Sequence, residues 1–431
     1  MPRRPYFPRL FRLVAAFVLV APSFASADDL AETLRKAAAA ALKARYPDYK
    51  PPPDPELVKL DAAIRRKPSS DAYLRRGQYW WLKNELDKSI ADFDAALKLE
   101  PDYGFVYRCR GLVKLTAERY DQAIADFTAA IPLRPNDCYL HYKRGVAWRE
   151  KGNVDQALAD FDAAIRMDPA NMVYLNDRGN IWRIKKDFNR SIKDFDASIK
   201  LSPTYALPYN NRGNSWADKK EFDRALADYA AAIRLDPTYA APLYNRADLL
   251  RQKEDYDRSL ADTAAALKLD PKLIQAHFLR GVLLLQTRRP GAAAGFQQVI
   301  DLGGYRGERA AHAVLLAYQS ARLAGDVVAA QRILTDSAGK LDKDVWPAPV
   351  VYFLRGDLSE SRLLSLATGD ISRQTLARCH LGIHHALAGD TSKAGVHFTW
   401  VRENGDPSLY EHPLALAEQK RMAKPAVSAK P

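Results

Sequence analysis

The sequence predicts an all-α protein built as a solenoid of stacked helix hairpins, and three observations carry this prediction. From Ser70 to Pro271 one pattern recurs six times with a spacing of 34 residues. Each copy has a small residue at its eighth position and a proline at its thirty-second. The small residues are Gly77, Gly111, Gly145, Gly179, Gly213 and Ala247, and the prolines are Pro101, Pro135, Pro169, Pro203, Pro237 and Pro271. One helix pair cannot bury both of its faces alone, so successive pairs are expected to stack.

The two helices expected in each copy have complementary faces. Residues three and four apart lie side by side on a helix, so positions 4, 8 and 11 of the first helix share a face. In the third copy these are His141, Gly145 and Trp148, and the second helix offers Ala157 and Phe161. We expect that aromatic residue to fill the notch left by the glycine. We also expect an Asp or Asn to accept hydrogen bonds from the free N–H groups that begin the second helix. These residues are Asp87, Asp121, Asp155, Asn189, Asp223 and Asp257.

The repeated unit resembles the tetratricopeptide repeat, a helix-turn-helix module with Gly at position 8, Ala or Ser at 20, an aromatic residue at 24 and Pro at 32. The resemblance covers nearly half of the chain. It implies a right-handed superhelical solenoid that acts as a scaffold for protein-protein interactions and is not an enzyme.

Two polar columns recur with the same spacing. Arginine occupies position 7 of seven successive copies, at Arg76, Arg110, Arg144, Arg178, Arg212, Arg246 and Arg280. Aspartate occupies position 23 of six copies, at Asp92, Asp126, Asp160, Asp194, Asp228 and Asp262. A guanidinium beside apolar packing needs a fixed carboxylate or carbonyl partner, so we predict a structural ladder of Arg–Asp pairs between stacked helices. The alternative is a basic stripe for an anionic ligand, and the matching aspartates favour the ladder.

The first 27 residues have the order of a secretory signal peptide. Basic residues up to Arg12 precede an apolar run from Leu13 to Ala21, and Ala25-Ser26-Ala27 forms a small-residue cleavage site before Asp28. The apolar run is shorter than the roughly 20 residues of a membrane span, so we expect cleavage rather than a retained anchor. The sequence thus predicts an exported, periplasmic protein with no stable membrane span after cleavage.

Composition and charge narrow the function classes. The chain of 431 residues is 47% apolar and 27% charged, with a net charge of +13. Four of its arginines lie in the first twelve residues, so about +9 remains without the leader. That charge suits the anionic surfaces of a cell envelope as well as nucleic acid. We expect no nucleic-acid partner.

The remaining pattern divides the chain into further segments. An amphipathic helix rich in alanine precedes a stiff proline-rich linker, and this helix is expected to cover either the end of the solenoid or another copy of the protein. After Pro271 the repeats decay, and a loop residue is lost around Pro290. The predicted segments are the signal peptide 1–27, the helix and linker 28–55, a partial repeat 56–69, seven repeats 70–307 with the seventh degenerate, degenerate helical repeats 308–374, a final repeat with a capping helix 375–421, and a disordered tail 422–431.

The C-terminal third carries a second resemblance. Trp346-Pro347, an apolar run ending in Gly356, Ile371-Ser372, a final repeat and a short helix beginning near Glu411 resemble the bacterial cell-envelope lipoproteins of the NlpI family. Those proteins are typically dimeric scaffolds that bring a periplasmic protease to its substrates and help control enzymes of peptidoglycan growth. The resemblance implies an envelope protease or a peptidoglycan enzyme as partner and leaves a homodimer open. This chain departs from the family because it has no lipidated cysteine and its repeats are more regular.

No catalytic motif is present in the sequence. A Gly-Lys-Ser/Thr phosphate loop, a Gly-x-Ser-x-Gly elbow, His-Glu-x-x-His and Cys-x-x-Cys are all missing. Cys379-His380 and His384-His385 are the nearest candidates, and His380 and His384 are spaced to share a metal ion. Two ligands do not complete a site, and His385 occupies a packing position. We therefore expect no enzyme activity, no cofactor and no metal, and keep an envelope enzyme or metal-binding protein that uses this cluster as the alternative.

Three cysteines leave at least one thiol unpaired in an exported protein. Cys109 and Cys138 fall on helices that should be neighbours, but they are offset along the chain by more than a turn. The geometric window for a disulfide is narrow, so their pairing stays open.

The resemblance to tetratricopeptide repeats places a ligand groove on the first helices, at positions 2, 5, 6, 9, 12 and 13. The groove residues in the middle of the chain are Tyr142, Arg149, Asn176, Asn180, Arg183, Asn210, Asn211, Asn214, Tyr244, Asn245, Asp248 and Arg251. Side-chain amides both donate and accept hydrogen bonds, so we expect a protein segment or extended peptide as ligand. The alternative is that these amides only keep the groove hydrated and bind no ligand.

A third function class is a cytoplasmic scaffold for a chaperone or for nucleic acid. The set of groove residues resembles part of the carboxylate clamp of chaperone-binding relatives. The lysine and arginine of that clamp are missing at Ala241 and Asn245. We therefore do not expect a chaperone tail as ligand.

Overall fold

The computed structural model describes residues 54–423, which contain α-helices and no β-strand. The predicted signal peptide, nearly all of segment 28–55 and the tail from 424 onward lie outside these residues. The chain divides into two compact units, Met1–Lys151 and Gly152–Pro431. Within residues 54–423, no helix is long and apolar enough to cross a membrane.

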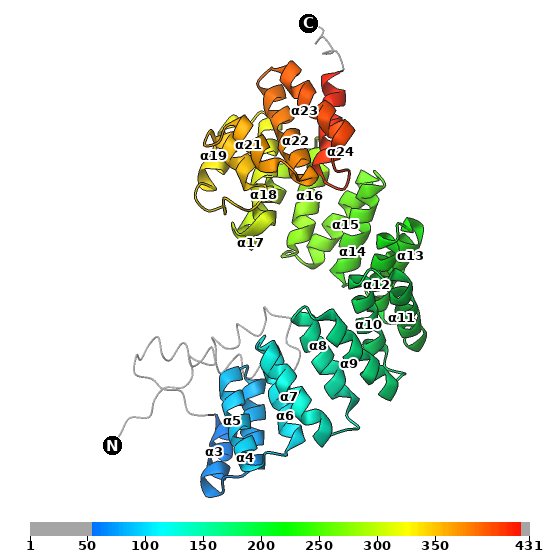
Figure 1. Ribbon diagram of the computed structural model, residues 1–431, viewed down its shortest axis with the longest axis vertical. Helices are drawn as coiled ribbons and strands as arrows, with labels where there is room; N and C mark the ends of the chain where they lie inside the picture. Colours follow the sequence, from blue (N-terminus) through cyan, green and yellow to red (C-terminus); the bar gives the residue numbers. More distant parts are fainter. Residues whose placement is uncertain (1–53, 424–431) are drawn as a thin grey trace, which may run out of the picture. The chain divides into compact units, whose positions relative to one another are not determined.

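The described part of the first unit consists of six helices, α3 to α8 (Figure 1). These are α3 (Pro55–Arg66), α4 (Ser70–Leu82), α5 (Leu86–Leu99), α6 (Gly104–Thr116), α7 (Tyr120–Leu133) and α8 (Cys138–Glu150). Helix α4 packs against α5, α6 packs against α7, and α8 follows against α7.

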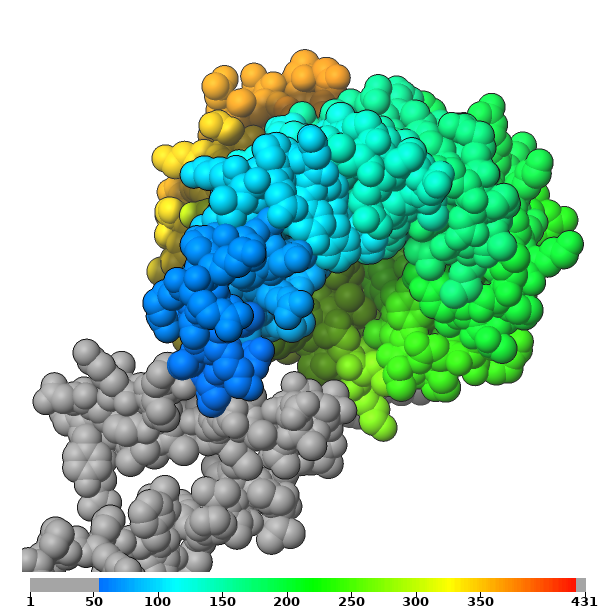
Figure 2. Space-filling view, turned by 90° about the horizontal axis from the view of Figure 1, so that it is seen from below, coloured from blue at the N-terminus to red at the C-terminus, as the bar shows by residue number. Residues whose placement is uncertain are grey.

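The second unit continues the same arrangement. Its first helices are α9 (Val154–Met167), α10 (Met172–Ile184), α11 (Phe188–Leu201), α12 (Ala206–Asp218), α13 (Phe222–Leu235), α14 (Ala240–Gln252), α15 (Tyr256–Leu269), α16 (Ile274–Gln286) and α17 (Ala292–Gly303). From α10 to α17 successive helices pack as antiparallel hairpins, and each hairpin packs on the next. In the space-filling view α12 to α15, in green, form a continuous surface (Figure 2). The predicted all-α solenoid of helix hairpins is confirmed.

The C-terminal part of the second unit has helices of less regular length around one apolar core. They are α18 (Gly307–Leu323), α19 (Val327–Asp336), α20 (Ala348–Arg355), α21 (Glu360–Ala367), α22 (Ile371–Leu387), α23 (Thr391–Asn404) and α24 (Glu411–Met422). Helices α22 and α23 form the last hairpin, and α24 packs on both of them. The predicted capping helix is therefore present, and Met422 is its last residue rather than part of a tail.

The hairpins are closed by the contact expected between a glycine and an aromatic ring. A Cβ atom added to Gly179 would lie 2.8 Å from the ring of Phe195, and one added to Gly382 would lie 2.5 Å from that of Phe398. The same contact joins Gly281 to Phe296 at 2.7 Å, although the loop before α17 is shortened. Because the aromatic rings of these three pairs are fully buried, any side chain at the glycine would displace them.

The expected caps of the second helices are wrong by two residues. These helices begin two residues earlier than predicted, and Asn153, Asp187 and Asp255 are the caps that accept a backbone N–H. The Asp and Asn residues that we expected as caps instead bind a basic residue of the next hairpin, and their exposed pairs contribute little stability. The pairs are Asp87–Arg119, Asp121–Lys151, Asp155–Lys185, Asn189–Lys219, Asp223–Lys253 and Asp257–Arg289.

Candidate functional site

Five of the seven arginines in the column form the predicted ladder. Arg178 donates from Nε and Nη2 to the two carboxylate oxygens of Asp194, at 2.8 and 2.7 Å. Its Nη1 also donates to Asp162 of the preceding hairpin, at 2.8 Å. The same bidentate contact is formed by the pairs Arg76–Asp92, Arg110–Asp126, Arg212–Asp228 and Arg246–Asp262. The ladder therefore binds the helices within each hairpin and, through a second carboxylate, binds hairpins to each other.

The second carboxylate was missed by the sequence analysis. It comes from Asp61 for Arg76, from Asp94 for Arg110 and from Asp196 for Arg212. Arg144 has Thr128 in that place, at 3.0 Å. The column of second partners is interrupted in the sequence by this threonine and by an alanine, Ala230, which is why it is hard to recognise.

The aspartates of the ladder stabilise the charged form of its arginines. The hydrogen bonds that Arg178 donates to Asp194 outweigh the effect of burial and raise the pKa of Arg178 above its ordinary value. Asp194 itself is only 5% exposed. Arg280 differs, because it is exposed and forms no ion pair with any described residue. The alternative of a continuous basic stripe is therefore not supported for the five paired arginines.

Two of the predicted groove amides are buried instead of lining a groove. Asn176 is 2% and Asn210 is 4% exposed. The amide nitrogen of Asn211 donates to Asn176 Oδ1 at 3.0 Å, and that of Asn245 donates to Asn210 Oδ1 at 2.9 Å. The side chain at position 5 thus lies between neighbouring first helices, where position 6 of the next hairpin reaches it. These amides form links between repeats, so Asn176 and Asn210 offer little exposed surface to a ligand.

Two other groove amides, Asn214 and Asn180, differ in their hydrogen bonds. Asn214 accepts a hydrogen bond from the hydroxyl of Tyr229 at 2.8 Å. That tyrosine is the aromatic residue of its hairpin notch, and its burial raises its pKa. Asn180 is half-buried and forms no hydrogen bond with a described residue. Its amide is therefore available to a ligand.

A polar cavity of about 290 Å³ lies on the first helices α10, α12 and α14. Five predicted groove residues line it: Arg183, Asn214, Tyr244, Asn245 and Asp248. The other lining residues are Ala217, Asp218, Tyr229, Leu249 and Gln252. Arg183 pairs with Asp218 at 2.6 Å, and Asp248 accepts from Arg251 and Gln252, each at 3.1 Å. The cavity is thus lined by positively and negatively charged hydrogen-bonding groups and by two tyrosine side chains.

Models of the tetratricopeptide repeat match residues 59–103, 110–172, 206–239 and 244–305. The chain carries tetratricopeptide repeats. A tetratricopeptide repeat protein from Parabacteroides merdae has 18% identity and a TM-score of 0.51, covering 57% of this chain and 98% of its own. YrrB, described as a repeat protein with an unusual peptide-binding site, has 21% identity and a TM-score of 0.39, covering 43% of this chain and 97% of its own. No curated protein matches the sequence.

The C-terminal segment covers the groove positions of the sixth and seventh tetratricopeptide repeats. The Tyr410 ring lies 4.6 Å from the Arg251 guanidinium and 5.7 Å from the ring of Phe278. Burial raises the pKa of Tyr410 to about 12. Arg251 was predicted to face a ligand, but its side chain is only 14% exposed beneath this tyrosine. Tyr410 therefore shields Arg251 from a ligand.

Tyr142 and Arg149 belong to the first unit, apart from the cavity. Tyr142 is 8% exposed and has the ammonium of Lys143 at 5.0 Å from its ring. Arg149 pairs with Glu150 at 2.7 Å. Neither residue contributes to the cavity on α10, α12 and α14.

The cysteines are not bonded to one another. Cys109, Cys138 and Cys379 are all free thiols. Burial raises the pKa of the Cys109 thiol to about 11, so this thiol stays protonated near neutral pH.

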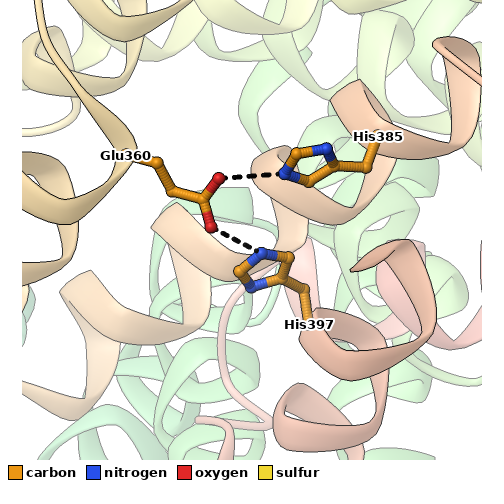
Figure 3. A group of neighbouring side chains, drawn as sticks. All are labelled: Glu360, His385 and His397. Atoms are coloured by element: carbon orange, nitrogen blue, oxygen red, sulfur yellow. Dashed lines mark hydrogen bonds and ion pairs between the residues drawn. The ribbon is translucent and has the colours of Figure 1, made fainter. Parts of the chain in front are cut away.

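The two histidines proposed to share a metal face different neighbours. His380 is fully buried with its Nε2 atom 3.8 Å from Glu411, and the His384 ring lies 5.2 Å from that of Phe353. His385 was assigned to packing, yet its Nε2 atom lies 3.0 Å from Glu360. His397 approaches the other oxygen of the same carboxylate, at 3.2 Å (Figure 3). Within residues 54–423, the group whose ligand atoms lie close enough to hold a metal ion is therefore Glu360, His385 and His397.

Two residues of this cluster have shifted pKa values. Burial raises the pKa of Glu360, but the hydrogen bond from His385 and the charge of His397 outweigh it, and the pKa is lowered overall. Burial lowers the pKa of His397, which favours the neutral imidazole.

Proposed function

We propose that this protein is a non-enzymatic scaffold that holds an extended polypeptide in the groove of α10, α12 and α14. The observation that carries the proposal is the cavity to which three successive first helices contribute side chains. Stacked repeats provide extended binding surfaces of this kind, because neighbouring units present equivalent positions side by side.

The chemistry of the cavity favours a peptide backbone over a small charged ligand. Its two carboxylates and its arginine already have internal partners, so no concentrated charge is left for an ion. Asn180, on the same helix as Arg183, supplies a free amide that can donate and accept at once. The rings of Tyr229 and Tyr244 provide limited apolar surface, which suits a segment held mainly by hydrogen bonds.

We place the protein in the periplasm and its partner among envelope proteins. The order of basic, apolar and small residues before Asp28 supports export. An envelope protease or an enzyme of peptidoglycan growth is the class of partner that we propose, with a second copy of the chain as another candidate. N-terminal sequencing of the protein recovered from cells should give Asp28 as first residue. An uncut N-terminus on cytoplasmic protein would remove the periplasmic assignment.

Site-specific photo-crosslinking in cells tests the groove. A crosslinking residue at Asn180 or Gln252 should capture a polypeptide, whereas the same residue at the exposed Lys193 of α11 should not. The captured segment, made as a peptide, should then bind the purified protein, and Asn180→Ala with Gln252→Ala should weaken binding at least about tenfold, or about 1.4 kcal/mol. Equal capture at Lys193, or unchanged peptide affinity, would show that the groove is not the binding surface.

A further inference from the structure

Three helices of the C-terminal region bring their side chains to one point. Glu360 is the first residue of α21, His385 lies near the end of α22, and His397 lies in α23. The two imidazole rings are stacked, with centroids 5.6 Å apart and planes within 2°. Each carboxylate oxygen faces the Nε2 atom of a different ring (Figure 3). One ligand atom from each residue lies within 4.8 Å of the others.

The contact between Gly382 and Phe398 in the last repeat positions the two imidazoles. His385 follows Gly382 by one turn, and His397 immediately precedes Phe398. The close contact between Gly382 and Phe398 fixes how α22 and α23 cross at this level. On the other side, the fully buried Leu363 and Ala367 anchor α21 to the core. All three ligand positions are therefore held by packed helices and not by loops.

We propose that Glu360, His385 and His397 bind a divalent transition-metal ion, with Zn²⁺ the best match. Imidazole nitrogens with one carboxylate are a common donor set for zinc, in sites that keep a fourth position for water. Metal–ligand bonds of about 2.0–2.1 Å in a tetrahedron place neighbouring ligand atoms about 3.3 Å apart. The two observed N–O separations, each to a different oxygen of Glu360, are 3.0 and 3.2 Å and are close to that value.

Exposure gives the site an open side. The His385 and His397 side chains are 12% and 5% exposed, whereas that of Glu360 is 35% exposed. An ion can therefore enter past the carboxylate, while the imidazoles form the closed wall. Once bound, it ties α21 to the α22–α23 hairpin, so its role is to stabilise the C-terminal region. This site is independent of the groove on α10, α12 and α14.

Metal titration of the purified full chain tests the proposal. After treatment with a chelator, the protein should take up one Zn²⁺ per chain in competition with a chromophoric chelator. It should also give the visible absorption of four-coordinate Co²⁺ when cobalt replaces zinc. Zinc should raise the melting temperature of the chain, because a ligand that binds only the folded state stabilises it.

Variants separate a metal site from a simple hydrogen-bonded cluster. Glu360→Gln keeps an acceptor for one imidazole but loses the charge, and it should weaken zinc binding at least about tenfold and abolish the thermal shift. His385→Ala and His397→Ala should do the same, whereas His384→Gln, next to the cluster, should bind as the wild type does. Where a histidine variant does not fold, Glu360→Gln decides, since its side chain is partly exposed. No zinc uptake by the wild type, or wild-type affinity in Glu360→Gln, would overturn the proposal.

Discussion

Removing one arginine from the ladder should show whether it is structural. Arg178→Ala removes three hydrogen-bond donors, of which two bind the buried Asp194 and one binds Asp162. Breaking a fully buried ion pair by deleting one partner costs about 3–5 kcal/mol. The Arg178 side chain is 22% and the Asp162 side chain 37% exposed, so water reaches part of this site. We therefore expect a loss of about 2–3 kcal/mol of unfolding free energy.

Arg280→Ala is the matched control, because Arg280 occupies the same repeat position but is exposed and forms no ion pair with a described residue. Its effect should stay within about 0.5 kcal/mol. Both variants are compared by urea unfolding followed by circular dichroism, using the change in midpoint, since a repeat array need not unfold in one step. If Arg178→Ala matches Arg280→Ala in stability but loses the captured peptide, the arginines form a binding surface and the ladder interpretation is wrong.

Three further predictions follow from the second unit and the thiols. Asn211→Ala should destabilise the fold by about 1 kcal/mol, because it leaves Asn176 Oδ1 unpaired, whereas Asn180→Ala should leave the urea midpoint unchanged; equal midpoints would contradict the amide links. Iodoacetamide at pH 8 should label Cys138 before the buried Cys109 and Cys379, as read by mass spectrometry, and faster labelling of Cys109 would contradict its raised pKa. Peptide affinity should change less than about threefold between low and physiological salt, because the charges of the cavity are already paired, and a steep salt dependence would point to ionic recognition.

Internal repetition explains why much of the fold could be predicted. Six copies in one register show which positions stay small, aromatic or charged, so the contact of Gly179 with Phe195 and the pairing of Arg178 with Asp194 could be inferred without any relative. The caps were placed wrongly because aspartate occurs both before a second helix and within its first turn, as at Asp187 and Asp223. Composition alone does not separate these two positions.

The candidate sites were harder to predict, because their geometry depends on contacts that cross repeats. Asn176 and Asn210 were assigned to the groove by position, but each meets an amide 35 residues later in the next hairpin. In the cluster of Glu360, His385 and His397, the two histidines lie in the last repeat but Glu360 lies outside the regular repeats. Glu360 comes from an inserted helix, so no fixed spacing relates it to the two histidines.

The distribution of charge bears on what the groove can recognise. A net charge of +13 would favour a nucleic-acid ligand. Most of the repeated cationic side chains, however, form ion pairs within the fold. Arg178 and Arg212 each bind two carboxylates, and Lys185 and Lys253 each bind an aspartate of the preceding repeat. What remains in the cavity on α10, α12 and α14 is a mixture of amides, tyrosines and paired charges. Such a surface discriminates by shape and by hydrogen bonds to a backbone, because an unpaired phosphate would find no free cation there.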